Sequence, residues 1–132
     1  MMTRDAAAVV AVVEDDDSAR KALGRLLEAG GFEPALFHSA EAFIEAPPAP
    51  APLCLILDVQ LGGMSGIDLQ GRLRRAGSDL PIIVTTGFRE ESIRSLAEKN
   101  GCSGFLFKPF NADLLLALIE SISRQPKPVH AP

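Results

Sequence analysis

The chain has 132 residues, 47% of them hydrophobic and 23% charged, which fits a single globular domain able to bury a core. A formal net charge of −4, without a block of Lys or Arg, argues against direct nucleic-acid binding. The apolar run 6–13 is well short of the roughly 20 residues that cross a bilayer, so no membrane-spanning segment is expected. Cys54 and Cys102 lie far apart without metal-binding spacing and suit a reduced, cytoplasmic protein in which both thiols are buried.

A strand followed by a helix is expected at the beginning of the chain. Residues 9–13 form an almost continuous β-branched run, the pattern of a strand buried on both faces of a parallel sheet. The run ends in the acidic residues 14–17, and Asp17 or Ser18 can cap the following helix, which Gly30 stops. Acids in a first helical turn complement the helix dipole, so part of this acidic run also has a purely structural interpretation.

A second strand–helix unit with weaker patterning follows. Residues 32–37 predict a strand, and Pro34 favours a place at the edge of the sheet because proline cannot donate to the ladder. Ser39 then caps a short helix. The stretch 46–52, rich in Pro and Ala, is expected to be a surface loop rather than a domain linker.

The middle of the chain predicts two further strands around one helix. The apolar run 53–57 is the third strand, and it places Asp58 at the start of a glycine-rich loop. A helix over 66–76 follows that loop. The fourth strand is expected at 82–85, ahead of a turn made by the Thr86-Gly87 pair.

The last two predicted helices differ in the strength of their apolar stripes. The helix that begins at Glu90 has a weak stripe, which consists of Ile93, Leu96 and Ala97. After a fifth strand at 104–107, Asn111 caps a final helix. Its stripe is the strongest in the chain and consists of Leu114, Leu115, Leu118, Ile119 and Ile122.

Five strands that alternate with five helices predict an α/β fold, namely a single doubly wound parallel sheet with right-handed crossovers and helices on both faces. We place the domain at residues 8–124. Residues 1–7 would form an N-terminal arm, and residues 125–132 a flexible, proline-rich tail.

Chemically useful side chains follow four of the predicted strands. In an open α/β sheet the loops after the strands meet at one edge, so residues distant in sequence become neighbours. Glu14, Asp15 and Asp58 would form a cluster whose mutual repulsion favours a divalent cation, and oxygen ligands favour Mg²⁺. Thr86 and Lys108 bring a hydroxyl and an ammonium to the same edge. These are the parts that phosphoryl transfer to an aspartate requires.

Five short motifs together resemble the receiver domain of two-component response regulators. They are Val12-Val13-Glu14-Asp15-Asp16, Leu57-Asp58, Met64-Ser65-Gly66, Val84-Thr85-Thr86-Gly87 and Lys108-Pro109-Phe110. The resemblance spans residues 9–124 and is similar in detail to receivers of the nitrogen-fixation regulator type, which join the receiver to a DNA-binding domain. It implies a flavodoxin-like, five-stranded sheet with strand order 2-1-3-4-5.

The resemblance implies the chemistry of the site. Asp58 would accept phosphate from the phosphohistidine of a histidine kinase or of a phosphotransfer protein. Mg²⁺ would be held directly by Asp15, by Asp58 and by the backbone carbonyl of Gln60, and through water by Glu14.

The resemblance also implies how phosphorylation is transmitted. Thr86 and Lys108 would contact the phosphoryl group, and Thr86 would move toward it while Phe105 turns inward to fill the vacated space. The surface formed by the fourth helix, fifth strand and fifth helix would change and control an output partner or domain. A phosphorylation-dependent homodimer is left open, and Phe105 also has a plain interpretation as a core residue.

Several positions depart from the family pattern or vary within it. Glu14 replaces the more usual Asp with a longer arm. Gly62 stands where many receivers have proline, so the loop after Asp58 should be looser. Gln60 and Phe88 occupy positions that tune hydrolysis of the aspartyl phosphate in the family, and we predict that Phe88 shields the phosphoryl group.

Three other interpretations compete with this one. An aspartyl-phosphate phosphatase or phosphotransferase usually carries a second acid two residues after the nucleophile, where this chain has Gln60. Catalysis beyond self-phosphorylation and self-dephosphorylation is therefore not expected. A flavodoxin-type cofactor protein would need a hydroxyl-rich phosphate loop after the first strand, where this chain has acids. The chain can also be a receiver cut from a longer DNA-binding regulator.

Overall fold

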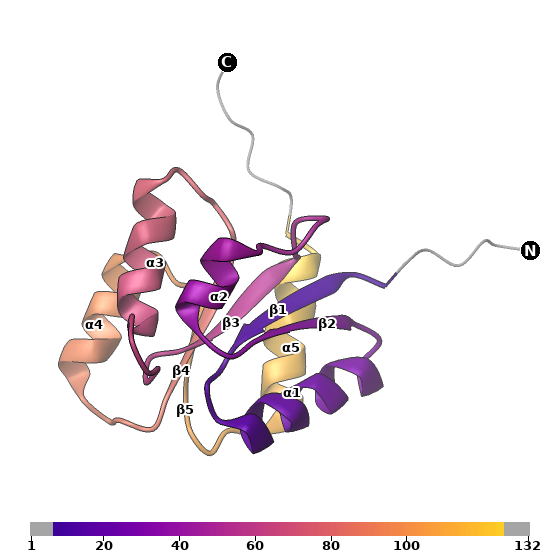
Figure 1. Cartoon of the computed structure of the whole chain (residues 1–132). Helices are drawn as coiled ribbons and strands as arrows, with labels where there is room; N and C mark the ends of the chain where they lie inside the picture. The colour runs from indigo at the N-terminus through magenta and orange to yellow at the C-terminus, as the bar shows by residue number, and fades with distance from the viewer. Residues whose placement is uncertain (1–6, 126–132) are drawn as a thin grey trace, which may run out of the picture.

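A computed structural model describes residues 7–125, in which five strands alternate with five helices along the chain (Figure 1). The strands are β1 (Val9–Val13), β2 (Glu33–Phe37), β3 (Cys54–Asp58), β4 (Ile82–Thr86) and β5 (Gly104–Phe107). They form one parallel sheet in the order β2-β1-β3-β4-β5. The predicted fold class and strand order are confirmed.

The helices cover both faces of the sheet (Figure 1). They are α1 (Asp17–Ala29), α2 (Ala40–Glu45), α3 (Gly66–Arg75), α4 (Glu91–Lys99) and α5 (Ala112–Ser123). Side chains from α1 and α5 share one core cluster, whereas α2, α3 and α4 share the other. Both clusters meet the sheet, so its central strands are buried on both sides, as their continuous apolar sequences predicted.

The alternation of side chains along each strand divides the core between the two faces. In β1, Val10 and Val12 pack with α1 and α5, while Ala11 and Val13 pack with α2, α3 and α4. The same alternation decides toward which face a side chain at the end of a strand points.

Two strands extend one residue further than predicted. Asp58 is the last residue of β3 and pairs with Thr85, and Thr86 is the last residue of β4 and pairs with Phe107. Both side chains are therefore placed by the ladder rather than by the following loops.

The predictions for the sheet edge, the two cysteines and the chain ends can also be compared with the structure. Pro34 lies in the edge strand β2, as predicted, and Cys54 is buried, whereas Cys102 is only half-buried. The predicted arm 1–7 and tail 125–132 lie outside the described residues, apart from one residue of each. Within the described part of the chain, every helix is too short or too polar to span a bilayer.

The helix α4 is anchored by few side chains. Ala97 is its one buried residue among those described, and its N-cap, Glu90, makes no side-chain capping hydrogen bond. Leu96, which the predicted stripe assigned to the core, is 48% exposed, and Leu114 of α5 is 50% exposed. Those two predictions were wrong because the core covers only part of each apolar stripe: Ala97 of α4 and Leu115 and Ile119 of α5 are buried, whereas Leu96 and Leu114 are not.

Two side chains of α3 hold the C-terminal end of α4. Gln70 is fully buried, and its Nε2 donates to the carbonyl of Ala97 at 2.9 Å. The guanidinium of Arg74 donates to four backbone carbonyls, those of Asn100 (3.1 Å), Gly101 (3.0 Å), Ser78 (3.0 Å) and Leu80 (2.9 Å). Arg74 therefore joins the turns that follow α3 and α4.

Candidate functional site

Three charged side chains stand at the carboxyl ends of β1, β3 and β5. Glu14, Asp58 and Lys108 each lie two residues beyond a core residue that packs with α1 and α5, so all three point toward that face. Backbone hydrogen bonds continue the sheet at this level: Glu14 N donates to Phe37 O at 3.1 Å, and Lys108 N donates to Thr86 O at 2.8 Å. The parallel ladder alone therefore brings these residues together.

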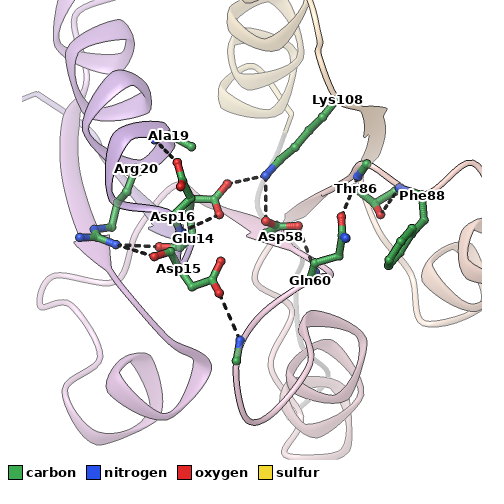
Figure 2. A network of polar contacts seen from close by, with 12 residues as sticks. Glu14, Asp15, Asp16, Ala19, Arg20, Asp58, Gln60, Thr86, Phe88 and Lys108 are labelled. Atoms are coloured by element: carbon green, nitrogen blue, oxygen red, sulfur yellow. Dashed lines mark hydrogen bonds and ion pairs between the residues drawn. The ribbon is translucent and has the colours of Figure 1, made fainter.

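The ammonium of Lys108 lies between the two carboxylates (Figure 2). Its Nζ is 2.5 Å from Glu14 Oε1 and 2.8 Å from Asp58 Oδ2, and both acids are almost fully buried. Burial raises the pKa of Glu14, and the nearby Asp58 adds to the rise while Lys108 opposes it. Burial by itself lowers the pKa of Lys108, but hydrogen bonds to Asp58 and Glu14 outweigh it, so the pKa is raised overall.

A third carboxylate completes an oxygen-lined cluster. Oxygens of Glu14, Asp15 and Asp58 lie within 4.8 Å of one another, and Asp15 is exposed whereas the other two are buried. Among the described residues, the one cation that forms ion pairs with these three carboxylates is Lys108, so negative charge is in excess. Oxygen donors with an exposed side are the environment that Mg²⁺ prefers. The sequence predicted this grouping.

The turn between β1 and α1 is shaped by Asp16, which the sequence did not select as the cap. Asp16 Oδ2 accepts a hydrogen bond from Ala19 N at 2.8 Å, so the predicted cap, Asp17 or Ser18, is wrong by one or two residues. The reason is that α1 begins at Asp17, which places the capping position one residue earlier.

Arg20 fixes the same turn, and sequence reasoning missed it. Its Nη1 donates to Glu14 O at 3.0 Å and to Asp15 O at 3.4 Å (Figure 2). Its guanidinium also forms an ion pair with Asp17. The spacing of Asp17 and Arg20, three residues apart in a helix, is a signal for the ion pair but not for the two backbone contacts.

The backbone that follows Asp58 is held against it. Gln60 N donates to Asp58 Oδ1 at 3.0 Å. The N–H of Gly66 donates to Val59 O at 3.1 Å, and a Cβ on Gly66 would lie 2.1 Å from Asp58 O. Only glycine allows α3 to begin this close to the strand end, which gives a physical reason for the motif Met64-Ser65-Gly66.

The middle of this loop has two carboxylate acceptors. Gly62 N donates to Asp15 Oδ2 at 3.3 Å, and Met64 N donates to Glu41 Oε2 at 3.0 Å. The loop was expected to be looser because Gly62 replaces a proline; these two contacts oppose that tendency. Sequence reasoning missed Glu41, because nothing in the pattern of α2 relates it to a loop more than 20 residues away.

The predicted switch residues lie on the other face of the sheet. Thr86 is fully buried and stands two residues beyond Val84, which packs with α2, α3 and α4. The ring of Phe105 packs against the same cluster while remaining half-buried. It contacts Phe107 edge to face at 5.2 Å between centroids, and the guanidinium carbon of Arg94 is 5.8 Å from its centroid.

The loop after β4 is tied to the Asp58 loop through Gln60 (Figure 2). Gln60 Oε1 accepts from Gly87 N at 3.0 Å, and Thr86 Oγ1 accepts from Phe88 N at 3.0 Å. The Phe88 ring is 47% exposed and lies beyond Thr86 as seen from Asp58 (Figure 2). The predicted shielding by Phe88 therefore stays a prediction for the phosphorylated protein.

An open apolar groove of about 470 Å³ lies beside the charged cluster, between α1 and the turn that precedes α5. Glu14 and Lys108 line the groove together with side chains of α1 and of that turn, among them Ala22, Leu26 and Phe110. The Lys108–Pro109 peptide bond at its margin is cis.

Fold and site together define a class of protein. The family described as Response regulator receiver domain matches residues 10–120, and the chain belongs to that family. It is therefore a receiver domain of two-component response regulators, a regulatory module.

Among its relatives, the transcriptional regulatory protein FixJ of Bradyrhizobium diazoefficiens is 39% identical over 117 residues, covering 89% of this chain and 57% of FixJ. Nodulation protein W of the same organism is 39% identical over 121 residues, 91% of this chain and 53% of that protein. The chain thus spans about half the length of the curated relatives it matches.

Solved structures agree with this assignment. The structure described as FixJ-N has a TM-score of 0.82 and 30% identity, and the match covers 96% of this chain and 100% of that one. Full-length FixJ from B. japonicum has a TM-score of 0.81 and 38% identity, with 89% of this chain and 58% of that chain covered.

Proposed function

We propose that this receiver is a phosphoacceptor switch of a phosphorelay, phosphorylated on Asp58 by the phosphohistidine of a histidine kinase or phosphotransfer protein. The observation that carries the proposal is the environment of the Asp58 carboxylate, whose Oδ2 is 2.8 Å from Lys108 Nζ and whose Oδ1 is 3.0 Å from Gln60 N. We place the domain at residues 8–124 and its action in the cytoplasm, consistent with two free cysteines.

The transfer step needs a fixed nucleophile and charge neutralisation. A carboxylate oxygen of Asp58 attacks phosphorus, the P–N bond to the donor imidazole breaks, and the leaving nitrogen keeps the electron pair and takes up a proton from water. Lys108 is already in contact with Asp58, so its ammonium can neutralise charge on the phosphoryl oxygens without a large movement. The hydroxyl of Thr86 can donate a hydrogen bond to a phosphoryl oxygen.

The residues of the cluster fit Mg²⁺. Asp15, Asp58 and the backbone carbonyl of Gln60 would hold the ion directly, and Glu14 would hold it through water. Mg²⁺ bound there would gather and neutralise phosphoryl oxygens. The chain's own contribution is to keep three carboxylates within reach of one ion despite their repulsion, which the half-buried Lys108 partly offsets.

The product of the reaction is a changed surface. Thr86 and Phe105 lie on the α4 face of the sheet, so movement of the Thr86 hydroxyl toward a phosphate on Asp58 leaves space that the Phe105 ring can fill. The affected surface is formed by α4, β5 and α5, where Leu96 and Leu114 are exposed. We propose that it controls an output partner or domain, or a second copy of the chain.

This switch would catalyse only its own phosphorylation and dephosphorylation. Aspartyl-phosphate enzymes protonate their leaving group with an acid, and the residue two positions after Asp58 is Gln60, whose amide accepts a hydrogen bond from Gly87 N.

The decisive experiment is labelling with a small phosphodonor. Incubation with Mg²⁺ and acetyl phosphate, followed by intact mass measurement, should add one phosphoryl group to the wild type and none to Asp58→Asn. Asp68→Asn, which alters an exposed acid in the first turn of α3, is the matched control and should be labelled normally. An unlabelled wild type, or a labelled Asp58→Asn, would contradict the proposal.

A further inference from the structure

The loop between β3 and α3 is attached to α2 by a single carboxylate. Met64 N donates to Glu41 Oε2 at 3.0 Å, and Gly63 passes so close that a Cβ there would lie 2.8 Å from the same oxygen. Gly63 has a φ of +80°, a conformation that glycine adopts without strain. The backbone thus runs directly over the Glu41 carboxylate.

Glu41 is an exposed residue whose backbone is held in place. It lies in the first turn of α2, whose start is set by Ser39, because the Ser39 side chain accepts from Ala42 N at 3.0 Å. Phe43 of the same short helix is buried in the core. The hydrogen bond from Met64 N lowers the pKa of Glu41, so the acceptor is ionised at neutral pH.

The second attachment of the loop differs in kind. Gly62 N donates to Asp15 Oδ2 at 3.3 Å, and Asp15 is one of the carboxylates proposed to bind Mg²⁺. That oxygen cannot accept the hydrogen bond from Gly62 N and coordinate a cation equally well. Glu41 lies outside the acidic cluster, so its contact with Met64 is independent of what Asp15 binds.

We infer that Glu41 is a positioning residue for the phosphoacceptor site: by holding Met64 N–H it keeps the loop that carries Gln60 in place beside Asp58 and Asp15. Two adjacent glycines, Gly62 and Gly63, give this loop more freedom in the unattached state than other residues would. The hydrogen bond from Met64 N to Glu41, which we call the tether, offsets that freedom. The inference rests on the proposed function, since the loop matters to phosphorylation only if Gln60 contributes to the Mg²⁺ site.

The first test measures the tether without metal. Amide hydrogen exchange at Met64 in the metal-free protein should become about tenfold faster in Glu41→Ala, because the N–H loses its acceptor. Glu41→Gln keeps an acceptor oxygen and should exchange within about twofold of the wild type. Glu45→Ala, at the other end of the same helix, is the matched control and should leave Met64 unchanged.

The second test measures the consequence for the site. Calorimetric titration with Mg²⁺ alone should give a dissociation constant about fivefold higher for Glu41→Ala than for the wild type, because ion binding must then order the loop. Glu41→Gln and Glu45→Ala should stay within about twofold. Thermal unfolding by circular dichroism checks that all variants are folded under the conditions of both tests.

The outcomes separate the inference from the proposed function. Unchanged exchange at Met64 in Glu41→Ala would overturn the tether, and faster exchange with unchanged Mg²⁺ affinity would overturn the positioning role. A wild type that binds no Mg²⁺ and takes no phosphate from acetyl phosphate would instead overturn the proposed function, and the positioning role with it, while the exchange data would still report the tether.

Discussion

The two faces of the sheet end differently at its carboxyl edge. Toward α1 and α5, Glu14, Asp58 and Lys108 are in direct contact, with ion pairs of 2.5 and 2.8 Å. Toward α4, Thr86 and Phe105 stand on the same face, but the helix above them buries one residue and lacks a side-chain cap. The charged face is tightly fixed, whereas the face with the proposed switch residues is lightly covered.

This difference fits the proposed function. A nucleophile and its charge partners must already be in position, because any movement needed before reaction adds to the barrier. A segment that reports phosphorylation must be movable by the energy of a few contacts, so a helix that buries one small side chain and lacks a side-chain N-cap is suitable. Changes in the charged cluster, or in the backbone that supports Asp58, should therefore have larger effects on stability than changes around α4.

The largest expected effect is at Gly66, where the start of α3 lies against the backbone of Asp58. Gly66→Ala would place a Cβ 2.1 Å from Asp58 O, so the start of α3 must move, and we expect a loss of about 3 kcal/mol in the free energy of unfolding. Urea unfolding measures this loss. Gly62→Ala, where a Cβ meets nothing within 4 Å, is the control, and an equal loss in both variants would contradict the account.

Removal of the central cation should come next. Lys108→Met leaves Glu14 and Asp58 buried without their shared partner, and we expect about 2 kcal/mol of destabilisation at pH 7. Because the pKa of Lys108 is raised, its contribution is present below the ordinary lysine value and is lost as the pH rises through the raised one. Urea unfolding at several pH values tests this dependence. Lys21→Met, which changes an exposed lysine of α1, is the control, and its free energy of unfolding is expected to change little.

Removal of one acid should have the opposite sign and a smaller size. Since burial raises the pKa of Glu14 above its ordinary value, the ionised form costs stability, and Glu14→Gln should stabilise the metal-free protein by about 1 kcal/mol at pH 7. The gain should shrink as the pH falls through the raised pKa of Glu14, because the wild-type carboxyl is then protonated.

The same variant should bind Mg²⁺ more weakly, which calorimetry can measure. Glu28→Gln changes an exposed acid of α1 and is the matched control for both measurements. A Glu14→Gln protein less stable than the wild type at pH 7 would show that the Lys108 contact outweighs the cost of burying the carboxylate.

The smallest effect is expected on the α4 face. Phe88→Ala should shorten the lifetime of phosphorylated Asp58 by about twofold, a small change because an exposed ring lends limited protection from water. Loss of the phosphoryl group after removal of the donor is followed by intact mass. Leu96→Ala, equally exposed on α4, should leave the lifetime unchanged, and an unaltered lifetime in Phe88→Ala would remove the shielding role.

Patterns that repeat along the chain predicted most of the fold. The buried run of β1 and the alternation of strands with helices were sufficient for a parallel sheet, and its topology brings Glu14, Asp15 and Asp58 together. The motifs then identified the family, because the residue types after four different strands matched it jointly.

The remaining features depend on contacts that no local pattern records. Glu41 and Arg20 contact backbone atoms of distant or irregular segments, and the periodicity of the sequence does not predict such contacts. Leu96 and Leu114 are apolar yet exposed, since a stripe shows that a helix has an apolar side but not how much of it the neighbours cover. The side chain of Gln60 bridges to Gly87 for a similar reason: the meeting of two loops follows from tertiary structure.

The four carbonyls gathered by Arg74 bear on how a signal could travel. The guanidinium binds the C-terminal end of α4 through the carbonyls of Asn100 and Gly101, at the opposite edge of the sheet from Asp58. At the N-terminal end of α4, Glu90 makes no side-chain capping hydrogen bond within the described part of the chain. We expect α4 to pivot about its C-terminal end, where Arg74 binds it. A small displacement beside Thr86 would then rotate the helix rather than translate it as a whole.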